Sequence, residues 1–259
     1  MKRKTEMKRY TLLIYILIVS WGSAWAQENG NVWFEQANAA YNAGNYDSAM
    51  VLYEKILALD VESVPLYYNM GNTYYKMHEY PMAIYCYEKA LKIDPSNEDV
   101  QTNLAIANRA IVDKIEPMPQ SFIVRWWQNA RALYSGDQWA WLSVFVFALL
   151  LVSVFMFLRA RKIGLRKLGF FAGLVFFLVF ALSVIFAFQL KQLSLTKDQA
   201  ILMTPTVNVK SSPNDASVDL FVLHEGTKVD VLETVEGWNK IRIANGSVGW
   251  LEADKMLPF

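Results

Sequence analysis

The chain has 259 residues, a net charge of +1, two histidines and a single cysteine. One cysteine cannot form an internal disulfide, and two histidines far apart do not form a metal or general-base motif. The charge is partitioned, because residues 1–9 and 159–167 are basic, whereas residues 27–115 hold 12 acids against 6 bases and residues 197–259 hold 9 against 6. A nucleic-acid-binding protein would need a basic patch on a folded domain, so the composition argues against nucleic acid as a partner.

Residues 1–26 have the pattern of a secretory signal peptide. Five bases among residues 1–9 precede a short apolar core at residues 12–19, and Ala24-Trp25-Ala26 fits an A-x-A cleavage site. The alternative is an uncleaved anchor. Both interpretations place the following segment on the outer side of the membrane.

Residues 30–95 contain an internal repeat with a period of 34 residues. The matching pairs are Ala37 and Gly71, Tyr46 and Tyr80, Ala49 and Ala83, Tyr53 and Tyr87, Ile56 and Ala90, and Asp60 and Asp94. This spacing resembles the tetratricopeptide repeat. It predicts an all-α domain over residues 27–115, with Gly44 and His78 in the turns and a capping helix at Glu98–Ile115. Because such stacks usually need about three units, the domain is expected to lean on a partner or on the membrane.

In this repeat family the first helices line a concave groove. The residues expected there are Phe34, Asn38, Tyr41, Asn42, Tyr68, Asn69, Asn72 and Tyr75. Asn38 and Asn72 occupy the same place in successive repeats, and an amide that donates and accepts at once suits the backbone of an extended peptide. Packing between helices is the alternative role for the tyrosines. The basic residues with which some members clamp a carboxylate are replaced by Phe34, Asp99 and Asn103, so carboxylate capture is not expected.

Residues 116–138 are predicted to form a juxtamembrane segment. Pro117 and Pro119 end the preceding helix. The stretch Phe122–Tyr134 then carries a broad apolar face, and tryptophans are enriched at membrane–water boundaries. The tryptophans in question are Trp126, Trp127, Trp139 and Trp141. An interfacial helix is therefore expected, with a helix packed on the repeat domain as the alternative.

Residues 139–158 and 168–190 are two uncharged apolar stretches of 20 and 23 residues. At 1.5 Å per residue each can cross about 30 Å of hydrocarbon, whereas a buried helix of a soluble domain rarely keeps all charge away for so long. The loop at residues 159–167 is expected to be cytoplasmic, because short basic loops stay inside. Its bases are Arg159, Arg161, Lys162, Arg166 and Lys167. Gly169 and Gly173 form a G-x-x-x-G, which suits either the hairpin's own interface or an oligomer.

After a tether at residues 191–197, residues 198–259 are predicted to be all-β. Strands are expected at Val207–Lys210, Lys228–Glu233, Trp238–Ile243 and Val248–Leu251, with a tight turn at Asn245-Gly246. The segments Val207–Pro213, Gly226–Val229, Gly237–Ile241 and Gly249–Leu251 together resemble the bacterial SH3-like domain. Trp238 and Trp250 are the candidate ligand residues, with core or strand packing as their alternative role.

Catalytic patterns are not found. There is no H-E-x-x-H, phosphate-binding glycine loop or G-x-S-x-G, His78 and His224 lie far apart in different modules, and Cys86 is the single cysteine. Neither an enzymatic activity, a cofactor nor a metal is expected.

The module order as a whole resembles the BatE family of the Bacteroides aerotolerance operon: signal, repeats, two-helix hairpin, SH3-like barrel. That resemblance implies a bacterial inner-membrane scaffold with both outer domains in the periplasm. It also implies other membrane proteins as partners, among them proteins with von Willebrand A domains. The alternatives are an envelope sensor whose SH3-like domain binds peptidoglycan, and a membrane-anchored accessory of an enzyme.

Overall fold

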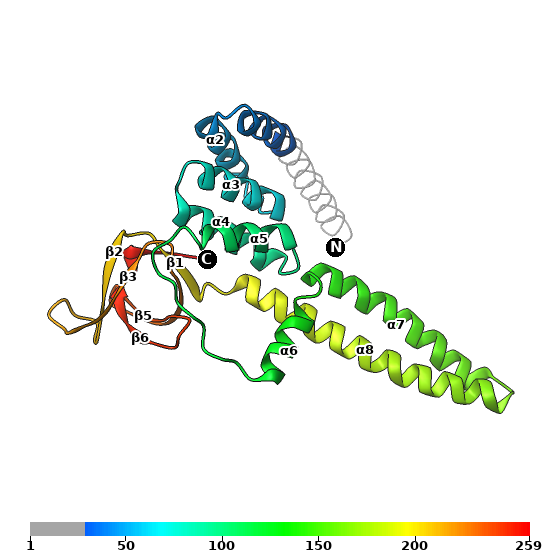
Figure 1. The fold of residues 1–259 in the computed structure, drawn as a ribbon. Coiled ribbons are helices and arrows are strands. Elements are labelled where there is room, and N and C mark those ends of the chain that lie inside the picture. Colours follow the sequence, from blue (N-terminus) through cyan, green and yellow to red (C-terminus); the bar gives the residue numbers. More distant parts are fainter. Residues whose placement is uncertain (1–28) are drawn as a thin grey trace, which may run out of the picture. The chain divides into compact units, whose positions relative to one another are not determined.

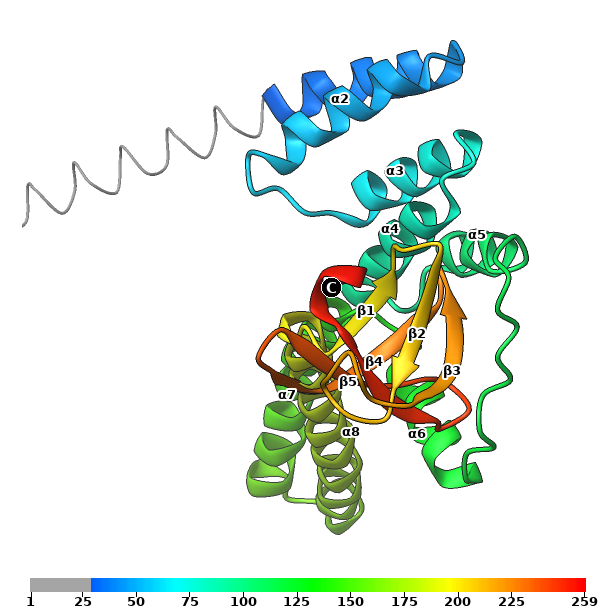
Figure 2. The same cartoon turned by 90° about the vertical axis from the view of Figure 1, so that its left-hand side faces the viewer.

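The computed structural model describes residues 29–259, so the predicted signal peptide lies outside the described residues. The chain divides into two compact units, Met1–Glu79 and Tyr80–Phe259. Figures 1 and 2 show helices in the first unit, and helices followed by a small β-domain in the second.

The first unit contains the first predicted repeat and the opening helix of the second. Residues 29–42 are helical, and α2 (Tyr46–Leu57) and α3 (Val64–Lys76) follow. The side chains of Asn45 and Ser63 cap α2 and α3 by accepting from backbone N–H groups three residues on. Gly44 has a φ of 78° and turns the chain between helices, as predicted. The small residues Ala37 and Ala49 are fully buried, which allows the helices to approach closely.

The second unit opens with α4 (Tyr80–Ile93) and α5 (Glu98–Ala107). The capping helix was expected to run to Ile115, and that expectation is wrong, because the helix ends at Ala107. The Lys114 ammonium donates to the carbonyl oxygens of Asn108 (2.8 Å) and Ile111 (2.6 Å), closing the end of the helix with a side chain. The α5–α6 linker, residues 108–121, then follows a non-helical path from residue 113 onward.

Three helices follow the linker: α6 (Phe122–Arg131), α7 (Gly136–Arg159) and α8 (Ile163–Leu195). Among the described residues, α7 and α8 are long and apolar enough to cross a membrane, judged by length and composition. α8 extends beyond the predicted stretch at both ends. The basic loop is therefore reduced to residues 160–162 and the tether to residues 196–198. No proline or left-handed residue interrupts the flanking sequence, so the helix continues through Gly164 and Lys191.

The two helices form a hairpin held by small residues (Figure 1). Gly173 of α8 faces Ser153 of α7, because a Cβ at Gly173 would lie 3.7 Å from the Ser153 Cβ. Gly169 comes even closer to the α7 backbone. The G-x-x-x-G thus lies at the hairpin's own interface.

The rest of the second unit is a seven-stranded antiparallel sheet in the order β3-β2-β6-β5-β4-β1-β7 (Figure 2). Its strands are β1 (Gln199–Leu202), β2 (Thr206–Lys210), β3 (Asp219–His224), β4 (Lys228–Val235), β5 (Trp238–Arg242), β6 (Val248–Glu252) and β7 (Met256–Pro258). The four predicted strands are present at β2, β4, β5 and β6, and β1, β3 and β7 are additional.

Alternating residues of this sheet form one apolar core. Val209, Ile241 and Leu251 are its nearly inaccessible centre, and Ile115 of the α5–α6 linker packs against it. Glu236 and Gly237 make the two-residue turn between β4 and β5, both with positive φ (48° and 85°), which matches the right-handed twist of a hairpin.

Candidate functional site

A polar cavity lies between the helices of the first repeat and α3, the opening helix of the second repeat. Its lining combines four asparagines with two tyrosines: Asn38, Tyr41, Asn42, Tyr53, Asn69 and Asn72. The first helix supplies three of these, α2 supplies Tyr53, and α3 supplies the remaining two. Repeat spacing therefore brings together side chains that lie about one period apart in the sequence.

Asn38 organises this cavity. Its Oδ1 accepts a hydrogen bond from the Tyr53 hydroxyl (2.7 Å) and another from Asn69 Nδ2 (2.8 Å). An amide oxygen has two acceptor positions, so both are used within the protein. The group that Asn38 can offer to a ligand is its Nδ2 donor. This differs from the expectation that the amide would donate and accept at once.

Tyr53 has a second role beside packing. Its side chain is fully buried and its ring lies 6.1 Å from that of Phe34. Burial raises the pKa of Tyr53 to about 12, against a smaller opposing effect of the hydrogen bond with Asn69. The hydroxyl is therefore a neutral donor that fixes Asn38 at physiological pH.

The structure brings some of the predicted groove residues together and leaves others out. Asn38, Tyr41, Asn69 and Asn72 line one cavity, as does Asn42. Phe34 packs on Tyr53, and Tyr68 and Tyr75 are half-buried on α3 outside that lining. Peptide binding by this set stays a prediction.

Trp238 and Trp250 project from the outer face of the SH3-like sheet. In β5 and β6 the alternating partners Asn239, Ile241 and Leu251 point into the core, whereas both tryptophans are half-buried. Lys240 lies directly opposite Trp250 and its ammonium stands 5.8 Å from the indole centre. Packing against a neighbouring strand therefore accounts for part of the burial of Trp250, and ligand binding by either tryptophan stays a prediction.

A shallow cavity lies beside Trp238. Residues of β2, the following loop, β6 and the short 3-10 helix after β6 complete it: Thr206, Val207, Asn208, Lys210, Asp215, Glu252 and Lys255. Lys210 pairs with Asp219 (2.8 Å), and Lys255 pairs with Glu252 (3.2 Å). The surface mixes an aromatic ring with charges of both signs.

The predicted interfacial helix α6 has two different apolar sides. Trp127 packs on Phe186 of α8, with ring centres 4.8 Å apart, and its Nε1 donates to Gln189 (3.2 Å). Trp139 is buried against Phe186, and Trp127 is partly buried beside it, so two of the four boundary tryptophans pack on the hairpin. Large side chains of the other side are more than half exposed: Phe122, Ile123, Trp126 and Leu133.

Among residues 29–259, no group of three His, Cys, Asp or Glu side chains could hold a metal ion. Cys86 is buried, and this burial raises the pKa of its thiol. His224, at the end of β3, has its Nδ1 2.8 Å from an Asp113 carboxylate oxygen. Asp113 lies 111 positions away, and no local pattern announced the pair.

Comparison with protein families gives the same division into a repeat region and a C-terminal β-domain. Tetratricopeptide repeat models match residues 30–62 and 64–97, and a bacterial SH3 domain model matches residues 205–255. A search of curated proteins returned no match to the chain. The chain thus contains two tetratricopeptide repeats and a bacterial SH3 domain, separated by two helices that could span a membrane. Domains of these two kinds typically bind proteins or cell-wall material and are typically non-catalytic.

Proposed function

We propose that the chain is a non-enzymatic membrane adaptor whose repeat domain, residues 27–115, binds an extended segment of another membrane protein. The observation that carries this proposal is the polar cavity in which Tyr53 and Asn69 fix Asn38. Preorganised amides suit a peptide backbone, since ordering them in advance lowers the cost of binding. Asn42 and Asn72 in the same lining extend this polar surface.

The proposed topology places both domains in the periplasm and the turn of the hairpin in the cytoplasm. The bases Arg159, Arg161, Lys162, Arg166 and Lys167 support this orientation through the positive-inside rule, even though some of them belong to helices. Reporter fusions after Ile115 and after Phe259 should report the outer side, and one at Gly164 the cytoplasm. A cytoplasmic signal after Phe259 would overturn this orientation.

The proposed partners are membrane proteins of an aerotolerance-type complex, including proteins with von Willebrand A domains. The support is the order of the modules, which resembles that of the BatE family. Co-purification from native membranes followed by mass spectrometry tests it. Recovery of wall material without membrane proteins would contradict it.

The groove is tested by the double variant Asn38→Ala/Asn72→Ala. Each amide should contribute about 0.5–1.5 kcal/mol, so loss of both should weaken binding roughly five- to a hundred-fold. Tyr53→Phe is a second probe of the same cavity, because it keeps the ring but removes the hydroxyl that positions Asn38. Full partner recovery by the double variant would reject the groove. If Tyr53→Phe alone causes the same loss, the positioning of Asn38 matters more than direct contact.

The second candidate function is peptidoglycan binding by the SH3-like domain, residues 198–259. The outward, half-buried placement of Trp238 and Trp250 favours it. The variant Trp238→Ala/Trp250→Ala should then lose binding to purified cell-wall sacculi while retaining membrane partners. Loss of membrane partners in this variant would instead make the tryptophan face part of the protein-binding surface.

A further inference from the structure

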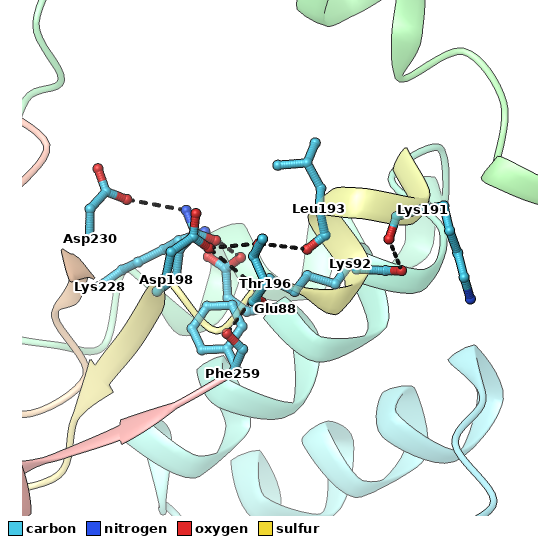
Figure 3. Close-up of polar contacts among 11 residues, drawn as sticks. Glu88, Lys92, Lys191, Leu193, Thr196, Asp198, Lys228, Asp230 and Phe259 are labelled. Carbon is cyan, nitrogen blue, oxygen red and sulfur yellow. Dashed lines mark hydrogen bonds and ion pairs between the residues drawn. The ribbon is translucent and has the colours of Figure 1, made fainter. Parts of the chain in front are cut away.

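One face of α4 is covered by the SH3-like domain (Figure 3). Tyr85, Glu88 and Lys92 follow one another at helical spacing, so they share this face. The Glu88 carboxylate pairs with Lys228 of β4 at 2.7 Å, and the Tyr85 ring meets Phe259 edge-on at 5.9 Å. The Glu88 side chain is 13% exposed and the Lys228 side chain 37%, so the pair is partly shielded from water on the Glu88 side.

Lys92 joins three segments of the chain at one ammonium group (Figure 3). It donates to the carbonyl oxygen of Thr196, just after α8 (2.6 Å), and to the backbone oxygen of Phe259, after β7 (2.8 Å). Asp198 lies 3.9 Å away, and the ammonium stands 5.0 Å from the Phe259 ring centre. Burial lowers the pKa of Lys92, with Asp198 opposing that shift.

The α5–α6 linker provides a second attachment to the same domain. Asp113 accepts from the backbone N–H of His224 and from the Thr227 hydroxyl, both at 2.7 Å. Further along, the Met118 N–H donates to the Ala244 carbonyl at 3.0 Å. The linker is therefore fixed at the β3–β4 turn and again beyond β5.

Apolar contacts join these polar attachments. Gly226 has a φ of 83°, and a Cβ there would clash with Ile111 of the linker and lie 3.4 Å from Ile84 of α4. Ile84 is 1% exposed. Since Ile115 also packs on the SH3-like core, the linker is part of that core rather than a free connector.

We propose that α4, the α5–α6 linker and the SH3-like domain fold as one cooperative body, attached without a flexible tether to the end of α8. The SH3-like domain then supplies α4 with contacts beyond those of the repeats, since a stack of two repeats buries little surface. The functional unit presented to partners is then a body of fixed geometry, in which neither α4 nor the SH3-like domain is fully stable without the other. This holds whether or not the repeat groove binds a peptide.

Hydrogen exchange of the full-length protein in detergent micelles tests the proposal. Lys228→Glu places like charges opposite Glu88, and it should raise exchange in α4 peptides by roughly fivefold or more, although the substitution lies in β4. Lys240→Glu is the matched control, because Lys240 lies in the same domain on its outer face beside Trp250. It should leave α4 exchange unchanged.

A reciprocal variant keeps the test informative. Lys92→Met removes the ammonium from α4 and should raise exchange in β1 and β7 peptides. If Lys228→Glu fails to fold, Lys228→Met removes the charge while keeping the side-chain stem. Exchange that changes only in the module carrying each substitution would overturn the proposal, as would α4 exchange raised equally by Lys240→Glu.

Discussion

A Cβ placed on Gly169 of α8 would lie 2.9 Å from the carbonyl oxygen of Ser153 on α7. The backbones of the hairpin therefore touch at a point where a glycine is required. Gly169→Leu should separate the helices and cost about 1–3 kcal/mol through overpacking. Cysteine cross-linking between α7 and α8 in membranes measures the effect. Gly164→Leu is the control, since nothing lies within 4 Å of its Cβ position, and an equal loss of cross-linking in both variants would contradict the assigned interface.

The repeat domain should be sensitive to volume at Ala83. This residue of α4 is fully buried, and its repeat equivalent Ala49 is as well. Ala83→Trp is expected to destabilise the domain by about 1–3 kcal/mol or more, because a packed interior cannot absorb an indole. Limited proteolysis of the full-length protein reads this out as faster cleavage within residues 29–107. Val51→Trp, at a position 52% exposed, should cleave like wild type; resistance of the Ala83 variant would reject the repeat register.

The linker attachment should weaken in acid. Burial alone would raise the pKa of Asp113, but hydrogen bonds from His224 and Thr227 outweigh it and hold this pKa below the usual range. A carboxylate with a lowered folded-state pKa contributes stability that is present above its unfolded pKa and lost as pH falls through the folded value. At pH 5 Asp113→Asn should therefore be less stable than wild type by about 1–3 kcal/mol. That difference should shrink between pH 5 and pH 2 in urea unfolding, and a gap that stays constant would show that the charge of Asp113 is unimportant.

The exposed side of α6 should lie in lipid. A spin label on Ile123→Cys should be protected from a water-soluble relaxation agent in vesicles and accessible to oxygen, because Ile123 is 75% exposed on the apolar side. The same spin label on Gln128→Cys, on another side of the helix, should be less accessible to oxygen than the label at position 123. Cys86 need not be removed first, because its thiol is buried and out of reach of the labelling reagent. Equal water access at both positions would place α6 away from the bilayer.

Periodic features of this protein were readable from its sequence. The 34-residue period located the helices of both repeats, and the alternation around Trp238 and Val248 located β5 and β6. The left-handed conformation at His78, with a φ of 65°, also agrees with its place in the repeat. Apart from the 34-residue repeat itself, these signals are local, because helix and strand periodicities depend on neighbouring residues.

Features set by distant contacts were not readable. The path of the chain beyond α5 is held by Asp113, which binds a turn more than a hundred residues away. In strand β3 the exposed residues Leu220 and Val222 are apolar, like the buried Leu223. The sequence therefore shows no alternation of apolar and polar residues that would have predicted this strand. In the groove, the sequence placed Asn38 correctly but could not show that Tyr53 and Asn69 would occupy its oxygen.

The length of α8 has a mechanical consequence. Its 33 residues make a rod of about 50 Å, longer than the roughly 30 Å of hydrocarbon it is proposed to cross. Such a helix adapts to bilayer thickness by tilting. Because Lys92 holds the backbone just past the end of this rod, a change in tilt would swing the SH3-like domain and α4 together. In the proposed membrane placement, a change in bilayer thickness would therefore move α4 and the SH3-like domain as a unit.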